Sequence, residues 1–210
     1  MAQTSTAQDA IRLLFIFVRG CEPLGENPFD YAGCFEGKTK LHAMDFWVRY
    51  PDYLAYQLLN KYEAEKEEGY LTKAREILRS EEPDIRSIPM IRYRYGAYDN
   101  INEPLSILLS KGLIVTDGEK SNGKIINYEF YVTKRAKELV DSIAIEFPIL
   151  KWFDDRAKLV TEIAGKLGGQ ALKEIQYQHM TYAKTSLGTL IPSIKTEVTS
   201  RLIKIIANHD

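Results

Sequence analysis

A short helix followed by a β-hairpin is the pattern that most constrains this chain, and it occupies residues 99–133. Apolar residues gather between Leu105 and Leu109, and Gly112 supplies the left-handed residue that commonly ends a helix. Residues 113–116 form a predicted strand, and 117–124 contain two glycines and an asparagine, which favour a turn. Residues 125–132 alternate apolar and polar side chains, so they predict a second strand that folds back on the first.

This order is that of the second half of a winged-helix domain, in which the hairpin is the wing. Two helical regions precede it, at 7–19 and 38–60, and Pro51 should divide the second region into two helices. Residues 20–37 are rich in glycine and proline and are predicted to be a loop with a contact role. The charged stretch 61–82 is interpreted as a solvated helix or a partly ordered insertion.

The strand predicted at 88–95 has period-two alternation, with Arg92 and Arg94 on one face. After the wing, Thr133 should cap a helix over 134–145, and further helices follow to the C-terminus. We therefore predict a mainly α (α+β) fold. A winged-helix domain would span 7–146, with the charged insertion at about 61–82, and a C-terminal helical extension would span 147–210.

Composition excludes several classes of function. The chain has 210 residues, a net charge of −1, two cysteines and three histidines, none of them in a metal-binding motif, so we expect no metal or cofactor. No apolar run is long enough to cross a membrane and no secretory signal is visible, so a cytoplasmic location is expected. Asp154 and Asp155 are adjacent, and neighbouring helix residues point about 100° apart, so they predict a solvated face. No catalytic constellation emerges, and we expect the protein not to be an enzyme.

Nucleic-acid binding would rest on a few cations. The candidates for contact with DNA are Arg92, Arg94, Lys111, Lys120 and Lys124. The helix at 100–111 lacks arginine and carries Glu103, which makes it a poor reader of the major groove. Any contact should therefore be insensitive to sequence. The other interpretation of Arg92 and Arg94 is pairing with acidic groups of a partner or of residues 63–68.

Large apolar side chains cluster around Pro148. Phe147, Trp152 and Phe153 are candidates for docking a partner, because an exposed aromatic patch marks an interaction surface. Burial in the core is the interpretation that the sequence favours, and a docking role is the alternative.

Three segments resemble one known family: 11–15 (IRLLF), 38–55 (KTKLHAMDFWVRYPDYLA) and 152–177 (WFDDRAKLVTEIAGKLGGQALKEIQY). With the wing, these segments resemble the middle components of ABC three-component systems, which include the small accessory subunit of Lamassu anti-phage defence systems. The resemblance covers about residues 8–182. It implies a non-catalytic, SMC-associated subunit that bridges an SMC-like ABC ATPase and an effector nuclease, with double-stranded DNA as a further candidate partner. The rival hypothesis is a winged-helix transcriptional regulator.

Overall fold

The computed structural model describes residues 5–80, 89–94, 96–118, 120–121, 124–125 and 127–208. Within these residues the helices are α1 (Thr6–Gly20), α2 (Lys38–Arg49), α3 (Pro51–Glu65), α4 (Glu68–Arg79), α5 (Asn102–Ser110), α6 (Lys134–Glu146), α7 (Pro148–Ala164), α8 (Gly169–Tyr177), α9 (Met180–Lys184) and α10 (Lys195–Ala207). The strands are β1 (Glu22–Pro23), β2 (Tyr31–Glu36), β3 (Ile91–Tyr93), β4 (Gly96–Tyr98), β5 (Ile114–Asp117), β6 (Lys120–Ser121), β7 (Lys124–Ile125) and β8 (Glu129–Thr133). The fold is mainly helical with a small antiparallel sheet, which confirms the predicted α+β class.

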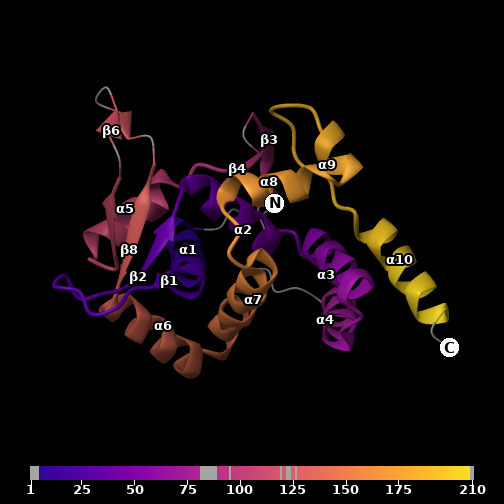
Figure 1. Ribbon diagram of the computed structural model, residues 1–210, viewed down its shortest axis with the longest axis horizontal. Coiled ribbons are helices and arrows are strands. Elements are labelled where there is room, and N and C mark those ends of the chain that lie inside the picture. Colours follow the sequence, from indigo (N-terminus) through magenta and orange to yellow (C-terminus); the bar gives the residue numbers. More distant parts are fainter. Residues whose placement is uncertain are drawn as a thin grey trace.

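The predicted hairpin is present. β5 pairs antiparallel with β8, and β6 pairs with β7 further along the same hairpin, which projects from one end of the molecule (Figure 1). The four-stranded sheet has the order β1-β2-β8-β5. The C-terminal helix α10 lies at the opposite end, beside α3 and α4 (Figure 1).

Several predicted helix boundaries are confirmed, each for a local reason. α2 ends at Arg49 and α3 begins at Pro51, because proline suits a first helical turn. Gly112 follows α5 with φ +63°, a conformation that costs glycine little. The Thr133 hydroxyl accepts a hydrogen bond from the Ala136 amide at 3.2 Å, so it caps α6 as expected.

The centre of the core is α1, which is buried on most sides. Phe17 packs against Phe35 of β2 and Phe130 of β8, with ring centroids 5.1 and 4.9 Å apart. On another side of the helix, Phe15 stacks on Phe153 of α7 at 6.1 Å. The wide apolar face seen in the sequence is therefore needed to cover the sheet and α7 at once.

Residues 20–37 were expected to be a loop, and that expectation is wrong for part of the segment. β2 spans Tyr31–Glu36 and lies between β1 and β8 in the sheet. Glycine and proline around it suggested a loop, but Phe35 faces the core and is fully buried. Pairing with β8, almost a hundred residues away, decides the conformation here and is not visible in local composition.

The charged stretch 61–82 is also more ordered than expected, as far as residue 80. α3 continues to Glu65, and α4 buries an apolar stripe formed by Tyr70, Leu71, Ala74 and Ile77. These residues have helical spacing, so α4 packs along α3 as an amphipathic helix. Residues 81 and 82 lie outside the described part of the chain.

The helices after residue 147 share the core of the preceding residues. α7 packs on α1 and α8 packs on α2. Residues 188–191 run antiparallel beside β3, with the Arg92 amide donating to the Thr189 carbonyl at 2.8 Å and the Ile191 amide to the Met90 carbonyl at 3.1 Å. The predicted extension is thus fastened to the rest of the protein along most of its length.

Candidate functional site

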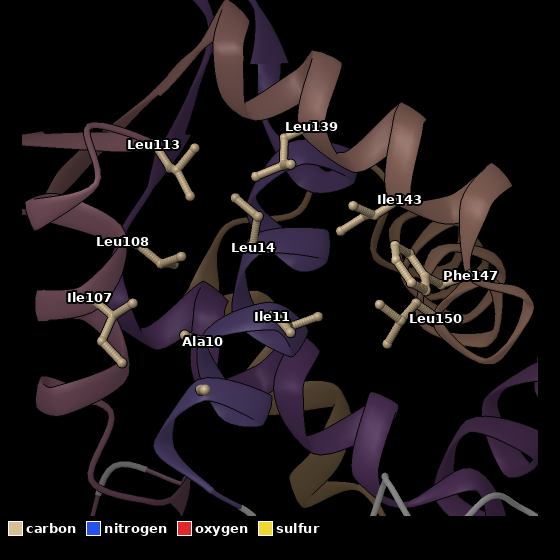
Figure 2. A pocket seen from close by; sticks show the side chains of 11 residues that line it. Ala10, Ile11, Leu14, Ile107, Leu108, Leu113, Leu139, Ile143, Phe147 and Leu150 are labelled. Carbon is tan, nitrogen blue, oxygen red and sulfur yellow. The ribbon is translucent and has the colours of Figure 1, made fainter.

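An apolar groove lies between α1, α5, α6 and the start of α7 (Figure 2). Its volume is about 340 Å³, and every residue that lines it is apolar. One wall is formed by α1, by α5 and by the residue before β5. Its residues are Ala7, Ala10, Ile11, Leu14, Ile107, Leu108 and Leu113. The opposite wall is formed by Leu139, Ile143, Phe147 and Leu150. Figure 2 shows Leu14 and Ile11 between the side chains of α5 on one side and those of α6 and α7 on the other.

The groove exists because α6 has more apolar surface than the core can cover. Ala136 and Val140 are the buried residues of this helix, and they face the interior. Leu139 and Ile143 form a second stripe, four residues apart, that stays at the surface. Leu139 is 38% exposed and Phe147 is 50% exposed, so the groove is open to solvent.

The corner between α6 and α7 adds further exposed apolar surface. Ile145 is 83% exposed and Ile149 is 56% exposed, on either side of Phe147. Single exposed apolar residues are ordinary, but a groove with an adjoining exposed corner is typical of an interaction surface. Of the three predicted docking residues, Phe147 lies at this surface.

The other two predicted docking residues have different environments. Phe153 is 2% exposed and stacks on Phe15, so its prediction as a docking residue is wrong: it belongs to the core. Trp152 is half-buried, with its ring 5.1 Å from that of Phe153 and the Arg156 guanidinium 4.8 Å from its centroid. Trp152 therefore supports the position of α7 and offers only part of its surface.

Exposed charges of both signs lie on the helices that form the groove. Lys111 follows α5 and Arg135 lies in α6, and the Arg135 guanidinium is 3.4 Å from the Lys111 carbonyl oxygen. Glu103 lies in the first turn of α5 and Glu146 ends α6, and both are exposed. An apolar groove on helices with exposed charged residues suits an amphipathic helix.

Arg92 was predicted to contact DNA, and this prediction is wrong. Its side chain is buried, with the guanidinium 4.3 Å from the ring centroid of Tyr177 and 5.3 Å from that of Tyr182. It also donates a hydrogen bond to the Tyr93 carbonyl. The alternation predicted the strand, but the arginine of β3 faces inwards and Tyr93 faces solvent.

The remaining cationic candidates are dispersed. Arg94 is exposed in the turn after β3, and Lys111 is exposed at the end of α5. The backbones of Lys120 and Lys124 lie in β6 and β7, and their side chains lie outside the described part of the chain. No basic patch is formed by the candidates that the structure describes.

The outer face of the sheet, which sequence reasoning missed, is acidic. Glu36 pairs with Glu129, and Glu129 pairs with Asp117, so three carboxylates stand side by side across β2, β8 and β5. The pKa of the Cys34 thiol is raised to about 11. Burial is the largest cause, and the negative charges of Glu129 and Glu36 add to it. The hydrogen bond that Tyr131 donates to Glu129 at 2.7 Å raises the pKa of Tyr131 to about 12. The alternation of polar and apolar residues at 129–132 was the sequence signal that could have indicated this face.

Among the residues that the structure describes, no group of three or more histidine, cysteine, aspartate or glutamate side chains is arranged to hold a metal ion. In the same residues, no helix combines the length and the apolar character that crossing a bilayer requires.

Comparison of the chain with known protein families, with curated proteins and with solved structures gives no match.

Proposed function

We propose that this chain is a non-catalytic accessory subunit of an anti-phage defence complex, in which it bridges an SMC-like ABC ATPase and an effector nuclease. The observation that carries the proposal is the open apolar groove between α1, α5, α6 and α7. A groove with this lining suits the apolar face of a partner helix, which inserts side chains at intervals of three and four residues. The family resemblance of segments 11–15, 38–55 and 152–177 supplies the identity of the partners.

The proposal includes a winged-helix core. Its support is the order of elements: α1, then β2, then α2, and later α5 followed by β5 and β8. β8 lies between β2 and β5 in the sheet, and we take the hairpin of β5 and β8 as the proposed wing. Residues 50–101 would then be an insertion between the second and third helices of the core, and they include α3 and α4.

DNA would be a minor partner in this proposal. The exposed polar residues of α5 and its end are Asn102, Glu103, Ser106, Ser110 and Lys111, with one cation and one carboxylate. The sheet beside the hairpin carries the Glu36, Glu129 and Asp117 carboxylates, which repel phosphate. These features disfavour the rival hypothesis of a transcriptional regulator, which needs a large specificity ratio for its operator.

Affinity purification of the tagged chain from its own host tests the proposal. We expect mass spectrometry to identify a coiled-coil ABC ATPase in the wild-type sample. The double variant Leu139→Glu/Phe147→Glu should weaken that association at least about 30-fold, because the loss of even one buried anchor side chain costs about 2 kcal/mol. Both residues are partly exposed, so the variant should fold.

The matched control is Leu187→Glu/Ile203→Glu, which places the same charges on residues that are 64% and 61% exposed and lie outside the groove. It should retain the ATPase. Thermal unfolding of both variants checks that they are folded. A wild-type chain that purifies without an ATPase, or a folded groove variant that retains it fully, would contradict the proposal.

A further inference from the structure

The outer face of the sheet carries a ladder of aromatic rings. Tyr131 of β8 stacks on Tyr31 of β2 with ring centroids 4.9 Å apart, and Tyr31 stacks on Phe29 at 5.7 Å. The inner face of the same strands is closed by α1, but Phe29 is 69% exposed and Val115 is 37% exposed. Exposed aromatic and apolar side chains therefore lie on this face beside the acidic row.

A pocket of about 360 Å³ opens on this ladder. One side is the loop before β2, with Leu24 and Phe29, and the other is the edge strand β5. Tyr31, Tyr131 and Asp117 are also among the residues that line it. The pocket thus combines flat aromatic surfaces with a negative charge.

The carboxylate row extends this negative charge across the sheet. Glu36, Glu129 and Asp117 occupy adjacent positions on three strands, and none of them forms an ion pair with a residue that the structure describes. Like charges placed directly opposite each other destabilise a sheet. Cations brought by a ligand would remove that repulsion.

We propose that this face binds an extended segment of a partner protein through its arginine side chains. A guanidinium stacks on tyrosine and phenylalanine rings and forms paired hydrogen bonds with a carboxylate, so the pocket and the row suit both of its properties. Lysine fits less well, because its ammonium is compact and cannot stack or pair in this planar manner. Nucleic acid would also stack on the rings, but its phosphates would meet the carboxylates.

This inference does not depend on the apolar groove, which uses α1, α5, α6 and α7 and none of these strands. It can therefore fail while the proposed function holds, and the reverse. If both hold, the chain has two separate binding surfaces, as a bridging subunit requires.

The experiment uses the full chain and a fluorescein-labelled peptide of alternating arginine and valine, with lysine and citrulline versions of the same peptide. Fluorescence anisotropy should show salt-sensitive binding of the arginine peptide, weaker binding of the lysine peptide, and none of the neutral citrulline peptide. Amide chemical shifts should change at Tyr31, Val115 and Tyr131. The variants Glu36→Gln/Asp117→Asn/Glu129→Gln and Phe29→Ala should each lower the affinity at least about tenfold, or 1.4 kcal/mol.

The control is Glu65→Gln/Glu67→Gln/Glu174→Gln, which removes the same number of charges from exposed positions on other elements and should bind like the wild type. Phe29 is a surface residue, so its variant keeps the test valid if the triple variant folds poorly. The proposal is overturned if the arginine peptide does not bind, or if it binds the folded variants as tightly as the wild type. It is equally overturned if a DNA duplex or a second copy of the chain occupies this face instead.

Discussion

Asp45 is a fully buried carboxylate held between two buried arginines. Arg12 donates from Nε to Oδ1 at 2.6 Å, and Arg49 donates from Nη1 to Oδ2 at 3.3 Å. Arg12 also pairs with Asp9, and Arg49 pairs with Asp99 at 2.8 Å. The network joins α1 to α2 and to the segment before α5. Each charge is tolerated in the interior because its partners are in place.

Replacing Asp45 with alanine should therefore destabilise the protein by about 3–5 kcal/mol, because two arginines would remain buried with fewer partners. Urea unfolding followed by circular dichroism measures the loss. The control is Asp155→Ala, which removes an exposed carboxylate paired with Lys151 and should cost about 1 kcal/mol or less. Equal losses of unfolding free energy in the two variants would show that the buried network stabilises the protein no more than an exposed ion pair does.

The same network predicts acid sensitivity. Burial alone would raise the pKa of Asp45, but Arg12 and Arg49 outweigh it and hold the pKa below its ordinary value. Since the folded state binds the proton less readily than the unfolded state, this stabilisation is complete above about pH 4–5. It declines as the pH falls towards the lowered pKa. Urea midpoints measured down this range should fall more steeply for the wild type than for Asp45→Asn, and parallel curves would refute the assignment.

Arg92 illustrates what local sequence does not determine. The alternation of residues 91–94 correctly indicated a strand, but the rings that cover Arg92 belong to Tyr177 and Tyr182, more than eighty residues later. Only the packing of α8 and α9 decides which face of β3 is inside. Phe153 is a similar case, because its burial depends on Phe15 of α1.

Arg92→Ala should destabilise the protein by about 2 kcal/mol or more, because a desolvated cation–π contact and buried packing are lost together. Arg94→Ala, two residues away at the surface, should cost less than Arg92→Ala, because the Arg94 side chain is exposed. Thermal or urea unfolding of both variants makes the comparison. A larger effect at Arg94 than at Arg92 would reverse the assigned orientation of the strand.

At the scale of elements, α8 approaches α2 very closely at Gly169. A Cβ atom at this position would lie 2.5 Å from the Lys40 backbone nitrogen and 2.8 Å from the Thr39 Cβ. The contact is fixed further along by the Gln176 side chain, which donates to the Ala43 carbonyl at 2.9 Å. Glycine is required here because backbone meets backbone.

Gly169→Ala should therefore cost about 1–3 kcal/mol or more, since the two helices must separate to admit the methyl group. The neighbouring Gly168 is the control: its Cβ would meet nothing within 4 Å and its φ of −77° suits any residue. Gly168→Ala should cost less than about 1 kcal/mol. Unfolding curves of the two variants that coincide would show that α8 is not seated on α2 as described.

Elements with strong local signals could be predicted from the sequence, and those without them could not. α5, the hairpin and α6 have a glycine stop, a polar turn and a threonine cap, and all three were located. β2 and the order in α4 were missed, because glycines and glutamates obscured short apolar patterns that only tertiary packing makes decisive. Of the groove, only Phe147 was predicted from the sequence. The other wall is formed by α1 and α5, which are distant from Phe147 in the sequence, so the local pattern could not indicate it.

For the whole molecule, the arrangement separates the two candidate surfaces. The inner face of the sheet packs on α1, so its outer face points away from that helix, while the groove is formed on α1 itself. The chain after α7 closes the structure by running beside β3 and by accepting a hydrogen bond from the Tyr50 hydroxyl at the Ile191 carbonyl, at 3.0 Å. Two separate surfaces of this kind are what the proposed bridging role would use.

Hydrogen exchange of the chain, alone and bound to the SMC-like ATPase that we propose as its partner, tests the docking role most directly. We predict slower exchange in the complex for residues 102–113 and 139–150, which form two walls of the groove, and unchanged exchange in α4. A stable complex in which both groove segments exchange as fast as in the free chain would contradict the proposal that the groove holds the partner.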